Sequence, residues 1–426
     1  MIQGSISESW RGLVCTQGAA QPAARVTDVL DRRKKICVVV VASRANLARI
    51  TTVLEAVRDH PALELQVIAA ASALLERFGC AVEVMEAAGF TPDAKIPFII
   101  EGQTPAMMAR STGLGLLELP TAFERLQPDV VVTVADRFET IATAIAGAYM
   151  NIPVAHTQGG EVSGSIDESV RHAITKLSHL HFPATELSAR RVIAMGEDPR
   201  YVFNVGCPSI DLAARARPGS RRDALIGHCG GGSPIDPDKP FLLVMQHGVT
   251  TEYGHGLDQM TATLRAISAI GMQALIFWPN VDAGSAEVAT AIQRFREQAL
   301  ANRCQFFCNL PAEDFARLMI HCACIIGNSS AALREGAFLG TPAVSVGTRQ
   351  CDRECGSNVM FTSQDPADIA EAVRAQLAHG RYQRSNLFGC GTAGRDIADV
   401  LATANPPVQK RLHYDSAALL GDRAEV

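Results

Sequence analysis

The chain has 426 residues, of which 47% are hydrophobic and 19% charged, and its formal net charge is -5. This length exceeds what one small core needs and suits two domains, and the balance of apolar and charged residues is typical of a globular protein. The charges of both signs are spread along the chain, which excludes the concentrated basic surface of a nucleic-acid-binding protein.

The ends of the chain carry little periodicity. Residues 1–34 are interpreted as a flexible extension, because the start contains Glu8 and Trp10 and no continuous apolar run. Neither a signal peptide nor a membrane span is predicted, since no apolar run approaches the required length. We therefore expect a cytoplasmic protein without a membrane or nucleic-acid partner.

The chain has 12 cysteines, and some lie close together in sequence. The nearest pairs, which invite a zinc-site interpretation, are Cys304 with Cys308, Cys322 with Cys324, and Cys351 with Cys355. None has the two-residue gap of a zinc knuckle, and no histidine pair with ligand spacing accompanies them. We expect reduced, mostly buried thiols and no metal.

A regular pattern begins at Lys35. Residues 36–41 form an unbroken apolar run, which is typical of a strand buried on both faces of a parallel sheet. Further strands are predicted at 65–69, 129–134 and 153–156, and helices at 44–58, 73–88, 113–126 and 140–150. This alternation predicts a Rossmann-like, doubly wound α/β domain over residues 35–212.

Residues 213–239 are rich in glycine and proline and are interpreted as a linker. A second α/β domain is predicted over 240–402, followed by a tail at 403–426. Its expected strands are 241–245, 273–278, 305–307, 323–326 and 343–346, and its expected helices are 257–270, 288–300, 313–322, 332–339, 365–379 and 391–402. Because ligands of open α/β sheets bind beyond the carboxyl ends of the strands, motifs at those ends are the functional candidates.

Two such motifs lie in the first predicted domain directly after strands. Arg44, after the first strand, is placed to bind a phosphate, or else is a solvated residue in a capped loop. Asp136, Arg137 and Glu139 follow the strand at 129–134; they are either used chemically or form a local ion pair at a helix start.

Two more motifs are longer. The segment 156–176 contains Gln158 and Glu161 in a glycine-rich loop, then Asp167 and Arg171 four residues apart on a helix, which alone also fits an ordinary helix with an ion pair. The segment 327–349 offers the small polar residues Asn328, Ser329 and Ser330 at a helix start, followed by Glu335 and Arg349. Its interpretation is a diphosphate site or simple helix capping.

Together these segments carry a family resemblance. "DRFET", "HTQGGEVSGSIDESVRHAITKLSHLHF", "VGCPSID", "MQHGVTTE", "FWPNVDAGS" and "IGNSSAALREGAFLGTPAVSVGTRQ" are similar to the hydrolysing UDP-N-acetylglucosamine 2-epimerases over residues 35–400. The resemblance implies two Rossmann-like domains in a GT-B arrangement. It also implies elimination of the nucleotide across C1–C2 of the sugar and addition of water, giving N-acetylmannosamine and a nucleoside diphosphate, UDP or GDP.

The resemblance also implies roles for individual residues. The catalytic set implied is Asp136, Asp167, His247, Glu161 and Gln158, and the substrate-binding set is Arg44, Arg137, Arg171, Asn280, Ser329, Ser330, Glu335 and Arg349. Elimination needs a base for the proton on C2 and positive charge for the departing diphosphate. No cofactor is implied, and a homo-oligomer that binds a nucleotide sugar is expected.

Four positions depart from the family pattern: Ala135, Asn46, Gln158 and Gly248. Gln158 stands where the family has an acid, and an amide cannot act as a general base near neutral pH. Glu161 or Glu139 would then replace it. Two alternatives stay open: a nucleotide-sugar hydrolase without epimerisation, and a GT-B glycosyltransferase or inactive nucleotide-sugar binder.

Overall fold

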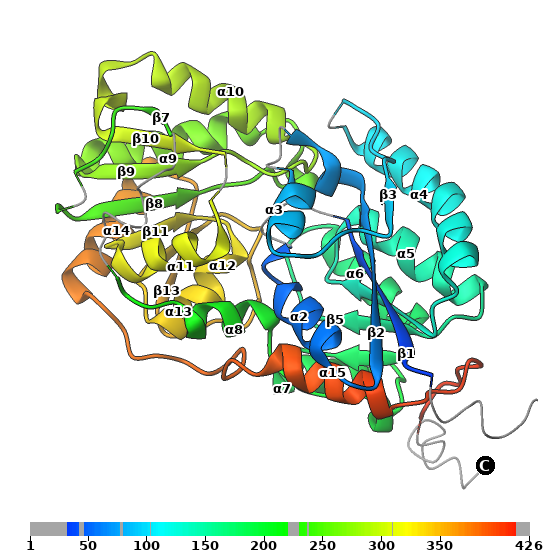
Figure 1. The fold of residues 1–426 in the computed structure, drawn as a ribbon. Coiled ribbons are helices and arrows are strands. Elements are labelled where there is room, and N and C mark those ends of the chain that lie inside the picture. The colour runs from blue at the N-terminus through cyan, green and yellow to red at the C-terminus, as the bar shows by residue number, and fades with distance from the viewer. Residues whose placement is uncertain are drawn as a thin grey trace, which may run out of the picture. The chain divides into compact units, whose positions relative to one another are not determined.

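A computed structural model describes residues 32–41, 47–76, 80–102, 104–219, 230–236, 238–308 and 310–414. The expected N-terminal extension, Arg44 and Asn46 lie outside these ranges, except for the last three residues of the extension. The described part contains two largely parallel sheets with helices on both faces, which confirms the predicted α/β fold class (Figure 1). The domain boundaries remain a prediction.

The first sheet has the strand order β3-β2-β1-β4-β5-β6, and all described pairings in it are parallel. Its strands are β1 (Lys34–Val40), β2 (Leu63–Ala70), β3 (Ala94–Ile96), β4 (Val130–Val134), β5 (Val154–Thr157) and β6 (Leu180–Phe182). This is the strand order of a Rossmann fold, in which the direction of winding reverses between β1 and β4.

Alternate residues of β1 explain why its apolar run is unbroken. Ile36 and Val38 belong to a core cluster with α2 (Thr51–Asp59), whereas Cys37 and Val39 pack in the cluster on the other face. Both faces of the strand are therefore covered by helices. The remaining helices of this half are α3 (Ala81–Ala87), α4 (Pro105–Leu126), α5 (Phe138–Tyr149), α6 (Asp167–Leu177), α7 (Glu186–Ala194) and α8 (Pro208–Arg215).

The second sheet has the order β13-β12-β11-β8-β9-β10-β7. Its strands are β7 (Gly231–Gly232), β8 (Phe241–Met245), β9 (Gln273–Phe277), β10 (Cys304–Phe307), β11 (Cys324–Gly327), β12 (Ala343–Val346) and β13 (Val359–Thr362). From β8 onward the order repeats that of the first sheet, with the reversal between β8 and β11. The helices are α9 (Gly256–Ile270), α10 (Ser285–Arg296), α11 (Ala312–His321), α12 (Ser330–Leu333), α13 (Glu335–Leu339) and α14 (Pro366–His379).

Several expected elements differ in the structure; the helix expected at 73–88, for example, is replaced by a short 3-10 helix at Ala71–Leu74 and by α3 at Ala81–Ala87. The helix expected at 113–126 begins at Pro105, where Thr104 accepts a hydrogen bond from the Met107 amide, because proline suits a first helical turn. The helix expected at 332–339 is two short helices that meet at Arg334. Within the expected linker, β7 pairs antiparallel with β10 and extends the second sheet.

The last helix belongs with the first sheet, whereas the sequence placed residues 391–402 in the second domain. In α15 (Ala393–Thr403), Ile397 and Leu401 join the core cluster of β1 and α2. Lys34 Nζ also donates to the carbonyls of Leu401 and Ala404, at 2.9 and 2.6 Å. The apolar stripe of α15 is thus buried on the first sheet, which periodicity alone cannot assign to either sheet.

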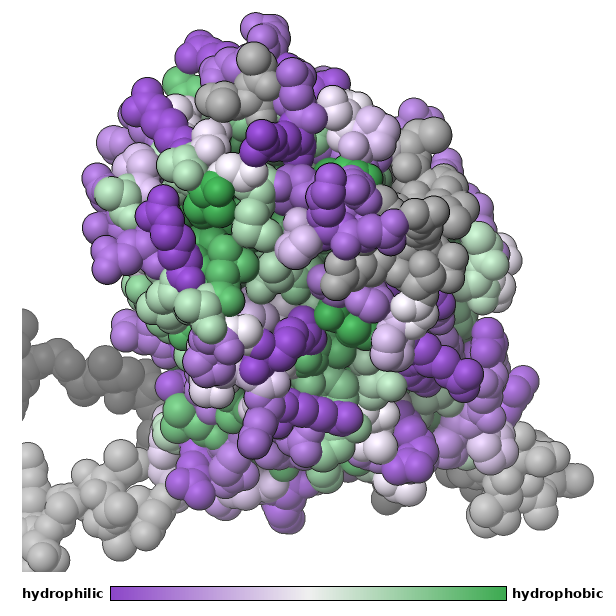
Figure 2. Space-filling model, turned by 90° about the vertical axis from the view of Figure 1, so that its left-hand side faces the viewer, coloured by the Kyte–Doolittle hydropathy of each residue, from purple (hydrophilic) through white to green (hydrophobic). Residues whose placement is uncertain are grey.

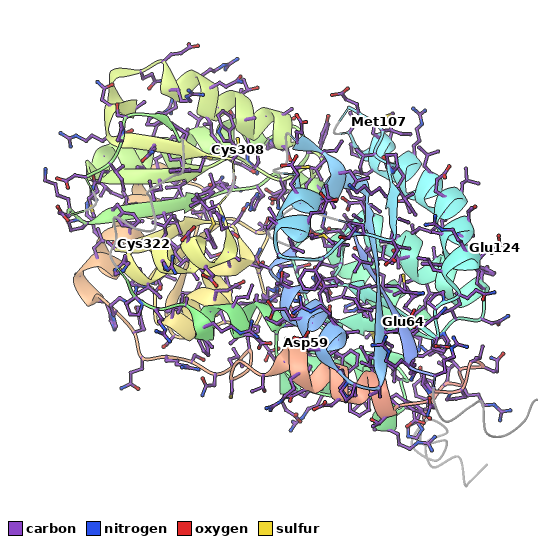
Figure 3. All side chains as sticks on the ribbon, viewed as in Figure 1. Asp59, Glu64, Met107, Glu124, Cys308 and Cys322 are labelled. Atoms are coloured by element: carbon purple, nitrogen blue, oxygen red, sulfur yellow. The ribbon has the colours of Figure 1, made fainter. Side chains whose placement is uncertain are left out.

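The surface and the thiols fit an ordinary globular protein. Hydrophilic side chains cover most of the face shown in Figure 2, with narrow strips of apolar residues between them. In the described residues no helix has the length and apolarity to span a membrane. The ten cysteines of this part are free, and six of them, including Cys322 (labelled with Cys308 in Figure 3), are buried.

Candidate active site

A polar pocket lies beyond the carboxyl ends of strands from both sheets. It is lined by residues that follow β4 (Asp136, Arg137), β5 (Ser163, Ser165, Asp167), β8 (His247), β9 (Asn280), β11 (Ser329, Ser330) and β12 (Arg349, Gln350, Arg353), together with Arg49. Both reversal points of the winding, β1/β4 and β8/β11, open onto it, which is where open α/β sheets bind ligands.

Asp136 is held in the pocket by a buried arginine. One carboxylate oxygen contacts the guanidinium of Arg171, which is 1% exposed and donates to the Glu161 carbonyl at 2.6 Å. Arg171, which was expected to bind substrate, does not line the pocket. Its side chain contacts Asp136 instead. The helical neighbour Asp167 is not its partner. An adjacent guanidinium favours the ionised form of a carboxyl group.

The residue before Asp136, Ala135, is one of the departures from the family pattern, and it has an unusual backbone conformation. Ala135 has φ +61°, the left-handed region that glycine adopts without cost. Its carbonyl accepts a hydrogen bond from Nε2 of buried His156, at 2.7 Å. This contact fixes the turn that points Asp136 toward the pocket, although alanine is strained there by about 1 kcal/mol.

Asp167 is the second carboxyl group that lines the polar pocket, and its environment differs from that of Asp136. It is half-buried at the start of α6. Burial, and then the negative charge of Asp282, raise its pKa against the opposing effects of Arg349 and Arg137. A carboxyl group with a raised pKa can hold and deliver a proton closer to neutral pH.

Arg137 joins the two halves of the site. It donates to Glu139, with Nε–Oε2 at 3.1 Å, and its Nη1 lies 2.8 Å from Asp282 Oδ1. Burial would lower its pKa, but the charges of Asp282 and Glu139 outweigh that and raise it. Glu139 is fully buried against Arg137 and Ser72, outside the pocket, so it does not replace the acid that is missing at position 158.

His247 is a neutral histidine with a defined tautomer. Burial, followed by the charge of Arg349, lowers its pKa to about 3. Nδ1 accepts a hydrogen bond from the Asn280 backbone amide at 3.3 Å, so the proton is on Nε2. The Asn328 side chain bonds both the amide and the carbonyl of His247, at 2.8 and 2.9 Å. The ring is therefore fixed as a hydrogen-bond donor at the pocket wall.

Hydroxyl groups complete the pocket at the end of β11. Ser329 caps α12 by accepting from the Ala331 amide, and Ser330 accepts from Arg49 Nη2 at 2.5 Å. The helix that begins here, α12, has four residues, too few for a strong helix dipole. The polar groups present at this point are the hydroxyls, the backbone amides and the guanidinium of Arg49.

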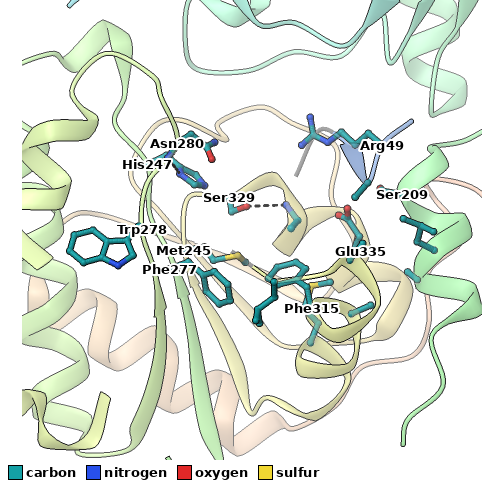
Figure 4. A pocket seen from close by; sticks show the side chains of 18 of the residues that line it. Arg49, Ser209, Met245, His247, Phe277, Trp278, Asn280, Phe315, Ser329 and Glu335 are labelled. Carbon is teal, nitrogen blue, oxygen red and sulfur yellow. Dashed lines mark hydrogen bonds between the residues drawn. The ribbon is translucent and has the colours of Figure 1, made fainter. Parts of the chain in front are cut away.

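An apolar pocket continues from the polar one and shares Arg49, His247, Asn280 and Ser329 with it. In Figure 4, Phe277 and Phe315 lie next to each other in its wall, with ring centroids 5.6 Å apart in an edge-to-face arrangement. The carboxylate of Glu335 points into the same space, and one of its oxygens has no hydrogen-bond partner among the residues that the structure describes. The aromatic side chains suit a planar ring, and the carboxylate of Glu335 can accept hydrogen bonds from hydroxyl groups attached next to such a ring.

Comparison with known proteins decides the family. Residues 55–402 match the family model for UDP-N-acetylglucosamine 2-epimerase. The UDP-N,N'-diacetylbacillosamine 2-epimerase (hydrolyzing) of Legionella pneumophila is 32% identical over 85% of this chain and 94% of its own length. The chain belongs to the UDP-N-acetylglucosamine 2-epimerase family.

Other members of the epimerase family give the same result. The GDP/UDP-N,N'-diacetylbacillosamine 2-epimerase (hydrolyzing) of Campylobacter jejuni is 28% identical over 79% of this chain and 86% of its own length. The crystal structure of UDP-GlcNAc 2-epimerase from Neisseria meningitidis, bound to UDP-GlcNAc, has the same fold, with a TM-score of 0.71 and 17% identity over 87% of this chain and 100% of that one. The GT-B arrangement of an epimerase is thereby confirmed.

Two expected catalytic residues of this epimerase-family chain lie outside both pockets. Glu161 is 3% exposed and is bound by the guanidiniums of Arg334 and Arg353. Burial opposes its ionisation, but the two arginines lower its pKa to about 2. Gln158 is fully buried; its amide donates to Cys207 Sγ at 3.2 Å and accepts from Arg334 at 3.1 Å. Neither side chain is positioned as a base, because both are already used in packing the two halves.

Four further residues at the site were not predicted from the sequence: Arg49, Asp282, Gln350 and Arg353. Arg49 lies in the stretch predicted as the first helix, and the "FWPNVDAGS" motif already contained Asp282 beside Asn280. Gln350 is the last residue of the quoted motif that ends in "VGTRQ", and Arg353 lies four residues after Arg349 and donates to Gln350. Among the described residues, no group of His, Cys, Asp and Glu has the arrangement of a metal site.

Proposed function

We propose that this chain is a hydrolysing 2-epimerase that converts a nucleotide-diphospho-N-acetylhexosamine and water into N-acetylmannosamine, or a substituted form of it, and a nucleoside diphosphate. The observation that carries the proposal is the composition of the polar pocket. Two carboxyl groups of different character face four arginines there, contributed by both halves of the chain. An apolar pocket of suitable chemistry for a nucleoside adjoins it.

The first step eliminates the diphosphate. Asp136, held in place by Arg171, takes the proton from C2 of the sugar, the C1–C2 double bond forms, and the C1–oxygen bond to the diphosphate breaks. Arg49, Arg349 and the Nε2–H of neutral His247 stabilise the charge that develops on the leaving phosphate. The enzyme-bound product of this step is a 2-acetamidoglucal.

The second step adds water across the new double bond. Asp167, whose raised pKa favours the protonated form, delivers a proton to C2 on the face opposite to the one first attacked. Water adds to C1 and gives up a proton that restores Asp167, while the proton held by Asp136 leaves to solvent, and the configuration at C2 is inverted. The two aspartates therefore divide the work without a third acid at position 158.

The nucleotide is proposed to be UDP or GDP. Its base would lie against the apolar pocket, and Glu335 would accept hydrogen bonds from ribose hydroxyls, which its free carboxylate oxygen allows. The names of the Legionella and Campylobacter relatives include UDP- and GDP-linked diacetylbacillosamine. We therefore propose a 2-acetamido sugar, and sugars with a second acetamido group belong in the test.

The test is an incubation in deuterated water with UDP- and GDP-N-acetylglucosamine and UDP-N,N'-diacetylbacillosamine. A 2-epimerase releases the nucleotide and a manno-configured sugar with deuterium at C2. Release with protium and the original configuration at C2 would instead show the hydrolase alternative, and no release without an acceptor would favour the transferase. A homo-oligomer located in the cytoplasm also remains a proposal, which sedimentation and cell fractionation would check.

A further inference from the structure

Asp282 lies between the two halves of the site and contacts an arginine from each. It lies on the connection between β9 and α10 and is 7% exposed. Oδ1 is 2.8 Å from Arg137 Nη1, and Oδ2 is 3.5 Å from Arg349 Nη2. Arg137 follows β4 of the first sheet and Arg349 follows β12 of the second, so one carboxylate connects two arginines from different halves.

A purely structural ion pair does not account for this arrangement. Burying a carboxylate costs several kcal/mol before pairing, and Arg137 already has Glu139 as a partner. Both arginines that Asp282 contacts line the polar pocket. The carboxylate therefore fixes the direction of the two cations that face the substrate, and its charge acts on whatever acid shares the pocket.

We propose that Asp282 is a positioning residue of the epimerase, which orients Arg137 and Arg349 across the pocket and sets the electrostatic environment of Asp167. The inference rests on the proposed function, since it assigns a part in that reaction. Asp282 does not touch the reacting atoms; it acts through the three residues around it.

The charge of Asp282 has a definite effect on Asp167. It is the largest of the charge effects that raise the pKa of Asp167, after burial. The other charged or titratable groups near Asp167 are Arg349 and Arg137, then Asp136, Arg49, His247 and Arg353 in the pocket wall, and Glu168, Arg171 and His172 on α6. Without the charge of Asp282, the two released arginines stabilise ionised Asp167, so its pKa falls.

The experiment compares wild type with Asp282→Asn and Asp282→Glu, measuring kcat and KM from pH 5 to 9 and UDP affinity by calorimetry. In Asp282→Asn we expect kcat near pH 7 to fall about tenfold. We also expect the alkaline limb of the pH profile, on which Asp167 loses its proton, to move down by about one pH unit. UDP affinity is expected to stay within about threefold, because no cation is lost. Asp282→Glu keeps the charge, so its limb stays near that of wild type.

Glu297→Gln, which removes an exposed carboxylate at the end of α10, is the matched control and should behave like wild type. A profile of Asp282→Asn that coincides with wild type at equal kcat, or an equal limb shift in Asp282→Glu, overturns the inference while leaving the epimerase function intact. If wild type neither binds UDP nor turns over any of the three sugars, the proposed function fails first and the inference fails with it.

Discussion

The guanidinium of Arg171, the fifth residue of α6, contacts the carboxylate of Asp136 at the end of β4. The pair connects neighbouring segments of the first sheet, because β4 and β5 are adjacent and α6 follows β5. The contact holds Asp136 in the pocket, which its side chain lines. Arg171 is needed for this although it is itself buried and cannot reach the substrate.

We expect Asp136→Asn to reduce kcat by about 10²–10⁴-fold, the range for loss of a positioned general base. Arg171 and the cations of the pocket are retained, so UDP affinity should change less than about threefold. Turnover assays and calorimetry measure the two effects. Glu124→Gln, on the outward face of α4 (Figure 3), controls for loss of a carboxylate. Turnover equal to wild type would remove Asp136 from the mechanism.

The nucleotide side responds differently. Ser330→Ala combined with Glu335→Ala removes the hydroxyl bound by Arg49 and the proposed ribose acceptor. Each lost hydrogen bond costs about 1 kcal/mol, so UDP affinity should fall about tenfold to a hundredfold. Calorimetric titration measures the UDP affinity, and Glu371→Ala, at an exposed residue of α14, is the control. Undiminished affinity would place the nucleotide elsewhere.

Gln158→Glu tests whether the family acid is missing from the chemistry. The new carboxylate would face Arg334 in a fully buried place outside the polar pocket, and the bond to Cys207 would be lost. We expect kcat/KM to remain within about threefold of wild type, because the side chain does not reach the substrate. A rise of tenfold or more would show that position 158 supplies a base after all.

Glu161 supports the contact between the two halves and gives stability a pH dependence. Its pKa is about 2 in the folded protein, below the ordinary 4.5. Its contribution, about 3 kcal/mol, is thus fully present above the unfolded pKa and is lost as pH falls from about 5 toward 2.

In Glu161→Gln two buried guanidiniums lose their counter-charge, and the free energy of unfolding at pH 7 should drop by about 3–5 kcal/mol. Urea unfolding at pH 7 and pH 4 measures both statements. Between those values the variant should lose less stability than wild type, since it no longer has this group to protonate. Parallel loss in the two proteins would show that another group governs the acid side; Glu124→Gln is again the control.

The alternation of apolar runs and helical spacing determined the fold class, because a strand covered on both faces, such as β1, has no room for polar side chains. Strand ends and helix starts also located Asp136, Asp167, Ser329, Ser330, Glu335 and Arg349. The family resemblance added His247 and Asn280, and each of these residues lines one of the two pockets.

Only the tertiary structure decided how these residues are paired. Arg171 lies one helical turn from Asp167 yet contacts Asp136. Glu161 forms ion pairs with Arg334 and Arg353. Asp282 contacts two arginines that follow strands of different sheets. Such partners are set by the packing of segments distant in sequence, and an ionisable side chain takes the nearest opposite charge in space. For the same reason α15 could be predicted as a helix, but not assigned to the first sheet.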